Sequence, residues 1–454
     1  MEFDKQEAPL YAALLQYAQD NPARFHMPGH KGTAQSPLGD IFGSALPFDV
    51  TELPETDSLF ADEGAILAAE RLAAELYGTR ETLFSAGGST LCIQAMLRLA
   101  TKSVPGAGKI ICARNVHRAA INTMALLDLE PIFIWPRPFE GSSMPGAIAP
   151  DDIAAALAAN ADVAAVFITS PDYYGVISDI AGISAVCRRY GVPLLVDNAH
   201  GAHLDCLDLH PIKQGADMSC DSAHKTLPAL TGGALLQIGS SRFARGDAKT
   251  AMTLFGSTSP SYLIMLSLDL ARAWMARDGR AAFSRLADRV AEFRAFCAAR
   301  GFYTPQGAVF DPVRITIDTA SRGVSGESAA QHFRSHGISP EMWDDRRVVL
   351  LPSPFNAAAD FTRLEAAVRT LETGPSLPDS VFLPERPERL LPLRTAIFAK
   401  TESVCVENSA GLVAAEASCP IPPCVPLIMP GERISGRMAG SLKKYGVLTI
   451  EVVK

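Results

Sequence analysis

Apolar residues repeat at helical spacing close to the start of the chain. Leu10, Leu14 and Tyr17 show this spacing after a proline, which predicts a short amphipathic helix over residues 9–20. The next segments, HMPGHKG and residues 45–59, are rich in glycine, proline and small polar residues. They predict an irregular arm, because such residues favour turns over regular elements.

From about residue 62 onward, helix-like runs alternate with short β-rich runs. Such alternation is typical of βαβ units, in which helices cover both faces of a mostly parallel sheet. We therefore expect a large α/β domain. Its predicted strands are Lys109–Cys112, Pro131–Trp135, Val163–Ile168, Val192–Asp197 and Ala234–Ile238.

A helical connector and a smaller α/β region are predicted after this domain. Residues 261–300 predict nearly continuous helix, and a proline-dense segment between Gly374 and Pro392 predicts a linker. Between them we expect a strand at Val313–Asp318, a helix near Ser328–His336, a strand at Val348–Leu351 and a helix at Phe361–Leu371. The expected domains are an N-terminal helix and arm (1–61), a large domain (62–285), a small α/β domain (286–373), and the linker with a C-terminal subdomain (374–454).

The composition is that of an ordinary globular protein with more than one core. The chain has 454 residues, of which 48% are hydrophobic and 20% charged. A net charge of -8 disfavours nucleic acid or an anionic membrane surface as a partner, since either requires a field of the opposite sign. The apolar runs are far shorter than the roughly 20 residues that span a bilayer, so we expect no membrane segment.

The N-terminus and the cysteines both favour a cytoplasmic location. The opening MEFDKQEAPL lacks the basic-then-apolar order of a secretory signal. The nine cysteines are odd in number and scattered, and none forms a C-x-x-C pair. They are typical of reduced thiols in a reducing compartment.

The strongest chemical signal is the segment SAHKTLPALTGG, which precedes the apolar strand at Ala234–Ile238. A lysine that forms a Schiff base with pyridoxal 5′-phosphate must lie where the aldehyde of this cofactor is held. A hydroxyl three residues earlier can reach the phosphate of the cofactor. Lys225 and Ser222 satisfy this arrangement. A lone lysine is usually a solvated surface charge, but this context favours the catalytic interpretation.

A second signal is Asp197, which ends the apolar run VPLLVD. In open α/β sheets ligands bind beyond the carboxyl ends of strands, so Asp197 is expected at the site. A carboxylate there can keep the pyridine nitrogen of pyridoxal 5′-phosphate (PLP) protonated, which makes the ring an electron sink. Alone, such an aspartate is more often a helix cap or turn residue.

The turn GGST and the stretch RNVHRA complete the expected cofactor site. Gly88 lets the backbone approach a phosphate, and the following helix N-terminus offers free N–H groups. Ser89 and Thr90 add hydroxyls, although both residue types are also common N-caps. His117, at the start of a later helix, is a candidate to stack on the cofactor ring, or else a plain first-turn residue.

Together these segments resemble the bacterial Orn/Lys/Arg decarboxylase family, PLP enzymes of the aspartate-aminotransferase-like fold (fold type I). The resemblance runs from about residue 25 to about residue 436, and it is to the shorter members, which lack a receiver-like N-terminal domain. The blocks that carry it, in the family's order, are FHMPGHKG, DVTELPETDSLF, AELYGTRETLF, RNVHRA, TSPDYYGV, VDNAHGAH, SAHKTLPALTG, STSPSY and PGERISG.

The resemblance implies decarboxylation of a basic amino acid to its amine and CO2, in polyamine-type metabolism. It implies that Lys225 forms the Schiff base, Asp197 pairs with the pyridine nitrogen and His117 stacks on the ring. It also implies a homodimer, or an assembly of dimers, with shared active sites to which Ser257 contributes from the neighbouring subunit. The implied cofactor-binding residues are Gly88, Ser89, Thr90, His117, Asp197, Ala199, His200, Ser222, His224, Lys225 and Ser257. Among these, we expect loss of His200 to perturb packing more than chemistry.

Three positions depart from the family's usual pattern. Asn198 stands where Glu or Ser is usual, Gly232 where a glutamine is usual, and Ile421-Pro-Pro-Cys424 where Tyr-Pro-Pro-Gly is usual. These changes put the shape of the pocket, and with it the identity of the substrate, in question.

A basic substrate needs a desolvated carboxylate partner for its distal cation. Glu341 and Asp344 are the candidates, followed by Asp345 and Glu52, although acidic residues are mostly solvated surface groups.

Two other functions stay open at this point. A PLP-dependent aminotransferase or lyase would use the same lysine and aspartate. A metal enzyme could use His200, His203 and Asp205, which lie close together in the sequence. We expect no metal, because that interpretation leaves the lysine segment unexplained.

Overall fold

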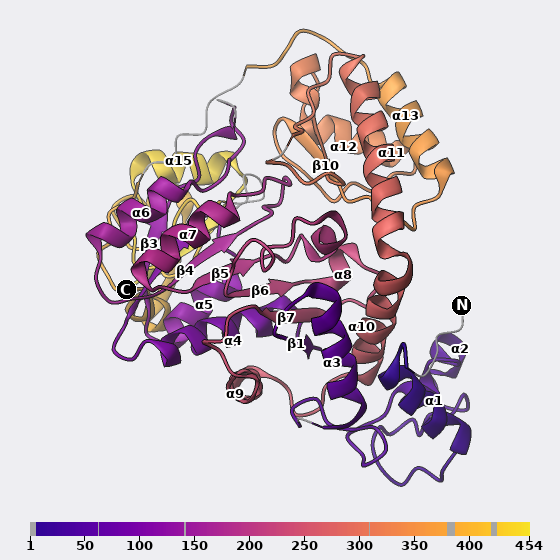
Figure 1. The fold of residues 1–454 in the computed structure, drawn as a ribbon. Helices are drawn as coiled ribbons and strands as arrows, with labels where there is room; N and C mark the ends of the chain where they lie inside the picture. Colours follow the sequence, from indigo (N-terminus) through magenta and orange to yellow (C-terminus); the bar gives the residue numbers. More distant parts are fainter. Residues whose placement is uncertain (1–5, 62, 140–141, 308, 379–385, 419–424) are drawn as a thin grey trace. The chain divides into compact units, whose positions relative to one another are not determined.

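The computed structural model describes residues 6–61, 63–139, 142–307, 309–378, 386–418 and 425–454 (Figure 1). The chain forms two compact units that are interleaved in the sequence. Unit 1 comprises residues 1–105 and 193–282, and unit 2 comprises residues 106–192 and 283–454. The four consecutive domains expected from the sequence remain a prediction.

Unit 1 contains the N-terminal helix, the arm and four strands. Its sheet order is β1-β7-β6-β5, in which β5 and β6 are parallel while β7 is antiparallel to both of its neighbours. Its elements are α1 (Pro9–Asp20), α2 (Gly39–Phe42), η1 (Leu46–Phe48), α3 (Gly64–Tyr77), β1 (Glu81–Ser85), α4 (Gly88–Ser103), β5 (Leu194–Asp197), η3 (Ala202–Leu207), β6 (Met218–Asp221), α8 (Ala223–Thr226), β7 (Ala234–Ile238), α9 (Arg245–Phe255), α10 (Tyr262–Trp274) and the π-helical turn η4 (Met275–Gly279).

The strands of unit 1 are short and fully buried. In β5, β6 and β7 every residue is buried, as expected for strands covered on both faces. The backbone N–H of Asp217 donates to the carbonyl of Leu194, and the N–H of Asn198 donates to the carbonyl of Cys220. These bonds lock β5 and β6 together at both ends, so the residues that follow their carboxyl ends are held side by side.

Helix α1 is fixed to α10 by a buried carboxylate. Asp269 Oδ2 accepts hydrogen bonds from the N–H groups of Leu10, at 2.9 Å, and Tyr11, at 3.2 Å. It thereby satisfies donors that the first turn of a helix leaves open. Burial raises the pKa of this carboxyl, while Arg272 and the two N–H groups oppose the shift. The predicted amphipathic helix is therefore tied into the unit by a residue about 260 positions away.

Unit 2 contains three parallel strands, a small antiparallel sheet and the C-terminal segment. Its parallel strands have the order β4-β2-β3, and β8-β10-β9 and β11-β12 are antiparallel. Its elements are β2 (Lys109–Ala113), α5 (Arg118–Leu126), β3 (Glu130–Ile134), α6 (Pro150–Ala159), β4 (Val163–Thr169), α7 (Ile180–Tyr190), α11 (Arg280–Ala298, entering from unit 1), β8 (Ile315–Asp318), η5 (Thr319–Arg322), α12 (Gly326–Ser335), β9 (Met342–Trp343), β10 (Arg347–Leu350), α13 (Ala358–Thr370), α14 (Leu393–Phe398), β11 (Thr401–Cys405), η6 (Val406–Asn408), α15 (Gly436–Lys444) and β12 (Thr449–Val453).

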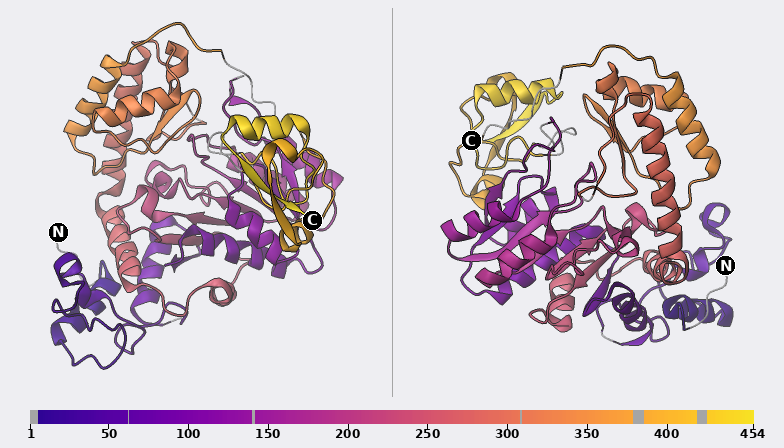
Figure 2. Two further views of the ribbon diagram at one scale, coloured as in Figure 1. Left: turned by 180° about the vertical axis from the view of Figure 1, so that it is seen from behind. Right: turned by 45° about the horizontal axis from the view of Figure 1, so that its top comes forward.

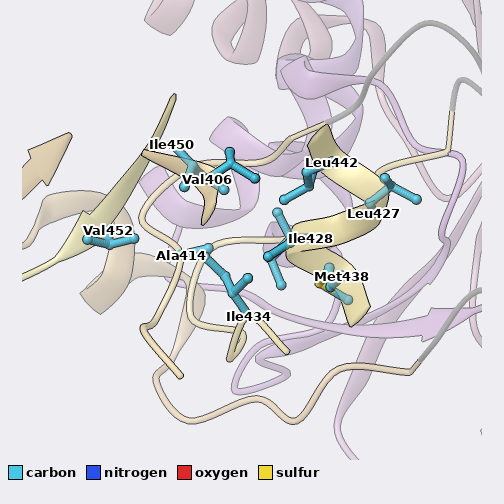
Figure 3. Packing of buried hydrophobic residues seen from close by; sticks show 10 residues of the cluster. Val406, Ala414, Leu427, Ile428, Ile434, Met438, Leu442, Ile450 and Val452 are labelled. Carbon is cyan, nitrogen blue, oxygen red and sulfur yellow. The ribbon is translucent and has the colours of Figure 1, made fainter. Parts of the chain in front are cut away.

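The C-terminal segment has a core of its own within unit 2. Figure 3 shows Ile428, Ile434 and Leu442 turned toward one another between α15 and the β11-β12 pair, and all three are fully buried. Figure 2 shows this segment, in yellow, beside the magenta strands and helices of the same unit. Arg394 at its start donates to the carbonyl of Ala125 at the end of α5, at 2.9 Å.

Most predicted elements are confirmed. The helix over 9–20 and the strand at Ala234–Ile238 have the expected bounds, and the helical run from 261 to 300 contains α10, η4 and α11. Strands β1 and β6 were not among the predicted strands, because ETLFS and MSCD are short and rich in polar residues. None of the helices in the described part of the chain combines the length and hydropathy needed to cross a membrane.

Candidate active site

Lys225 lies on α8, a single helical turn that follows β6 directly. Its Nζ atom is 3.0 Å from Nε2 of His200, on the loop that follows β5. The sequence predicts that His200 matters mainly for packing, but this contact places its imidazole against the reactive amine. His200 is therefore part of the lysine's immediate surroundings and is unsuited as a neutral control.

The cofactor phosphate would meet a buried hydroxyl and an open helix end. The side chain of Ser222 is completely buried, and its Oγ atom has no hydrogen-bond partner among the described residues. Such an atom normally has a partner, so its isolation fits a ligand oxygen. Among the described residues helix α4 has no capping side chain, so the N–H groups that follow Gly88 in its first turn are available to an anion.

A backbone contact links the two phosphate-binding segments. Gly88, at φ +66°, donates its N–H to the carbonyl of Gly232, at φ +96°, over 2.8 Å. A Cβ at Gly232 would also lie 3.2 Å from Ile264 Cδ1. Glycine therefore suits this departure from the family pattern, because an L side chain at this φ would be strained. Ser89 is partly buried and Thr90 exposed on the first turn of α4.

Asp197 ends β5 with only 2% of its surface exposed. Its Oδ1 atom accepts a hydrogen bond from the N–H of Ala199, at 3.1 Å, and lies 3.5 Å from Sγ of Cys220. Burial, followed by the charge of Asp197, raises the pKa of the Cys220 thiol well above its usual value. The thiol thus stays protonated and can donate to the Asp197 carboxylate.

His224 and Ser257, two further expected residues of unit 1, differ in their surroundings. His224 Nδ1 lies 2.9 Å from the carbonyl of Gly233, which orients its ring along the Lys225 loop. Ser257 is exposed between α9 and α10, and its Oγ accepts from the N–H of Ser259.

His117 belongs to unit 2, where it caps helix α5. Its Nδ1 atom accepts a hydrogen bond from the N–H of Ala119, at 3.1 Å, and its side chain is exposed. His117 is therefore an N-cap, one position before the first turn where the sequence placed it as the alternative to stacking. Stacking of its ring on the cofactor remains a prediction.

The two carboxylates proposed for substrate binding, both in unit 2, differ sharply. Asp344 is buried and accepts from Tyr174 Oη, from Arg347 Nη1 and from two backbone N–H groups. A carboxylate with this many protein partners is structural, so Asp344 is a poor candidate for a substrate cation. Glu341 is exposed and accepts from Tyr173 Oη at 3.0 Å.

The residues of the alternative metal site have other partners. Asp205 pairs with Lys213 Nζ at 2.7 Å, and His200 faces Lys225. Within the described residues, no group of three or more histidine, cysteine or acidic side chains is placed to hold a metal ion. The third departure from the family pattern, Ile421-Pro-Pro-Cys424, lies outside the described residues.

Sequence reasoning missed a carboxylate next to the lysine segment. Asp221 ends β6, is completely buried, and accepts hydrogen bonds from Asn198, His210 and Gln237. Its position immediately before Ser222 was the available signal. The partners could not be anticipated, because they lie between 11 and 23 residues away along the chain.

Comparison with known proteins matches almost the whole chain. The family model "Orn/Lys/Arg decarboxylase, major domain" matches residues 8–308, and "Orn/Lys/Arg decarboxylase, C-terminal domain" matches residues 392–447. The chain is 33% identical to "Uncharacterized protein YaaO" of Bacillus subtilis over 96% of this chain and 94% of that protein. It is 30% identical to the "Arginine decarboxylase" of the same organism, over 94% of this chain and 91% of the relative.

The solved structures agree on the fold. The crystal structure of the Francisella novicida lysine decarboxylase LdcF superposes with a TM-score of 0.82 at 18% identity, covering 98% of this chain and 81% of that one. This likeness establishes the α/β fold of type I PLP enzymes. The family matches lead to one conclusion: the chain belongs to the Orn/Lys/Arg decarboxylase family of PLP-dependent amino-acid decarboxylases.

Proposed function

We propose that this enzyme decarboxylates arginine, with Lys225, Asp197 and the surrounding groups of unit 1 holding PLP. The observation that carries the choice of substrate is the 30% identity to the Bacillus subtilis arginine decarboxylase over nearly the full length of both chains. In the reaction the bond from Cα to the carboxylate breaks, CO2 leaves, and a proton replaces it at Cα. The product is the amine of arginine, a precursor suited to polyamine-type metabolism.

Lys225 and Asp197 would act on opposite ends of the cofactor ring. When bound, PLP supplies a conjugated ring that accepts the electron pair left at Cα. Lys225 anchors the cofactor aldehyde through its Nζ atom and is positioned by His200 at 3.0 Å. Asp197 keeps the proton on the pyridine nitrogen, because its buried carboxylate favours the positive charge there.

The phosphate would be held by neutral donors. Ser222 Oγ is buried without a partner among the described residues, and the first N–H groups of α4 are uncapped by any side chain. A phosphate oxygen would satisfy both, and the positive end of the helix dipole would favour its charge. Ser89 and Thr90, on the same turn, are the further hydroxyls that we assign to it.

For the distal cation of the substrate we propose Glu341 in preference to Asp344. Asp344 already accepts four hydrogen bonds from protein groups. Glu341 is exposed and is oriented by Tyr173. A guanidinium can bind a carboxylate through two N–H groups at once, which an ammonium cannot match.

We also propose that the active unit is a homodimer or an assembly of dimers. Phe25 and Ile41 on the N-terminal arm expose 97% and 78% of their surface, and a partner subunit would cover such apolar residues. Sedimentation should show a dimer or larger species, and a fully active monomer would contradict the proposal. We place the enzyme in the cytoplasm, where thiols such as Cys92 remain reduced.

The test of the substrate is CO2 release from arginine, lysine and ornithine by the purified enzyme with added PLP. We expect kcat/KM for arginine to exceed the other two by roughly tenfold or more, since a carboxylate that pairs with two N–H groups of a guanidinium typically loses over about 1 kcal/mol with an ammonium. Equal or faster turnover of lysine or ornithine would overturn arginine. Amino transfer to a keto acid without CO2 release would overturn decarboxylation itself. The variant Lys225→Ala measures the background.

A further inference from the structure

Three neutral donors surround the buried carboxylate of Asp221. Asn198 Nδ2 lies 2.6 Å from Oδ1, and Gln237 Nε2 and His210 Nε2 lie 2.9 Å and 3.0 Å from Oδ2. All four side chains are completely buried. We call these residues, Asp221, Asn198, His210 and Gln237, the Asp221 cluster.

The protonation of His210 follows from its other contact. The N–H of Ile212 points at His210 Nδ1 over 3.4 Å, so Nδ1 accepts and Nε2 carries the hydrogen that is donated to Asp221. Gln237 is oriented in the same way, because its Oε1 atom accepts from the hydroxyl of Thr82. The donors of His210 and Gln237 therefore have a fixed direction.

The cluster joins the two loops that carry the proposed chemistry. Asp221 immediately precedes the segment from Ser222 to Lys225, and Asn198 immediately follows Asp197. The side-chain bond between Asn198 and Asp221 runs alongside the backbone bond from Asn198 N to Cys220 O, at 3.0 Å. Gln237 adds the neighbouring strand β7. Groups that must bind a rigid ligand depend on such a supporting layer for their geometry.

We propose that Asp221 is a positioning residue for PLP: through Asn198 it holds Asp197 and the Ser222–Lys225 segment at the spacing that the cofactor requires. This inference rests on the PLP site proposed above. It also accounts for one departure from the family pattern. A glutamate at position 198 would place a second carboxylate against Asp221, whereas Asn198 supplies the matching N–H donor.

The test compares PLP binding with folding in three variants. Asp221→Asn keeps the shape of the side chain but turns its N–H group toward other hydrogen-bond donors. Asn198→Asp places two carboxylates next to each other. The double variant Asn198→Asp with Asp221→Asn exchanges the amide and the carboxylate, so that the amide at position 221 can donate to the carboxylate at position 198 and still accept from His210 and Gln237. Asp217→Asn is the matched control, because Asp217 joins the same two strands at their other ends by accepting from Leu194 N at 2.9 Å.

The readouts are the dissociation constant of PLP for the apoenzyme and the melting temperature of the apoenzyme. We expect each single variant to weaken PLP binding by roughly tenfold or more, equivalent to about 1.4 kcal/mol. The reversed pair should recover most of this loss, and Asp217→Asn should stay within about twofold of wild type. Affinity within twofold of wild type in Asp221→Asn, or no recovery in the reversed pair, would overturn the proposal.

Two further measurements keep the outcome unambiguous. If Asp221→Asn does not fold, Asn198→Ser removes a single donor, and PLP affinity unchanged in that variant would equally overturn the role of the cluster. The PLP site itself is tested separately by the visible absorbance band of the wild-type holoenzyme. Borohydride reduction that still fixes a pyridoxyl group to the chain in Lys225→Ala would refute the site, whatever the result at Asp221.

Discussion

Two buried carboxylates, Asp221 in unit 1 and Glu432 in unit 2, are held in opposite ways. Asp221 accepts hydrogen bonds from two amides and an imidazole. Glu432 forms a two-pronged ion pair with Arg114, with Nη1–Oε1 at 2.6 Å and Nη2–Oε2 at 2.7 Å. Neutral donors stabilise a carboxylate without cancelling its charge, whereas an ion pair cancels both charges.

The surroundings of Arg114 match a structural role. Its Nε and Nη2 atoms also donate to the carbonyls of Pro426 and Leu427, and its guanidinium lies 4.6 Å from the centre of the Trp135 ring. The hydrogen bonds of Arg114 tie the end of β2 to the C-terminal segment. In unit 1, by contrast, two amides and an imidazole surround Asp221, which directly precedes the segment proposed to hold PLP. Unit 1 therefore surrounds a buried carboxylate with neutral donors, whereas unit 2 pairs a buried carboxylate with a cation.

Removing the cation at the site should have the largest effect. We expect Lys225→Ala to lower turnover at saturating PLP by roughly 10³-fold or more, because no other group can anchor the cofactor aldehyde. Borohydride reduction followed by peptide mass analysis should find the pyridoxyl group on Lys225 in the wild type.

Lys213→Ala is the matched control for this change. Lys213 lies in the same unit but pairs with Asp205, so its loss should leave turnover nearly unchanged. A reduced pyridoxyl group on any other lysine would refute the assignment of Lys225.

Neutralising Asp197 tests whether charge matters at the site. Asp197→Asn should retain PLP yet lower turnover by roughly 10²- to 10⁴-fold, because an amide cannot keep the ring nitrogen protonated. Steady-state CO2 release and PLP content measure the two effects separately. Near-normal turnover in this variant would mean that the carboxylate acts only through the N–H of Ala199 and the thiol of Cys220.

The sequence was sufficient to predict the groups that lie close together along the chain. The sequence predicts that Ser222 and Lys225 share one short segment and that Asp197 ends a strand, as the structure shows, while their roles toward a cofactor stay predictions. The helix over 9–20 and the strand β7 followed from the periods of apolar residues. These features depend on local propensity, which a single sequence contains.

Long-range partners could not be predicted in the same way. Arg114 and Glu432 are 318 residues apart, and no sequence pattern near either residue predicts the other as its partner. Asp221 was not among the predicted site residues, because its three donors lie between 11 and 23 residues away along the chain. Asp344 was expected to bind the substrate cation, but Arg347 and Tyr174 already donate hydrogen bonds to its carboxylate. Whether a buried charge is satisfied depends on tertiary contacts, and a sequence pattern does not contain these.

Breaking the ion pair of unit 2 should affect stability more than chemistry. We expect Arg114→Met to lower the free energy of unfolding by about 3–5 kcal/mol, because it leaves Glu432 charged and buried without its partner. Urea unfolding followed by circular dichroism measures the loss. The double variant Arg114→Met with Glu432→Leu should be less destabilised than Arg114→Met alone, since no orphaned charge remains. Equal destabilisation of both variants would show that packing against Trp135 matters more than charge.

Asp172 is a third buried carboxyl to set beside Asp221 and Glu432. Among the described residues it has neither a full set of hydrogen-bond donors nor a close ion pair. It follows β4 in unit 2, and its Oδ1 atom accepts from the N–H groups of Gly175 and Val176. Its Oδ2 atom has no hydrogen-bond partner among the described residues. Burial raises the pKa of Asp172 to about 7, while these N–H groups and the charge of Arg314 oppose the shift.

The stability of the protein should therefore depend on pH through Asp172. A folded pKa of about 7 exceeds the unfolded value, so the native state binds the extra proton between about pH 4 and pH 7. The contribution of Asp172 to the free energy of unfolding is complete below its unfolded pKa. It is lost as the pH rises through the folded pKa, by on the order of 2–4 kcal/mol. Asp172→Asn stays neutral at every pH and should gain stability relative to wild type from pH 5 to pH 8. Urea unfolding of both proteins across this range measures the difference, and parallel profiles would show that the folded protein does not retain a proton on Asp172.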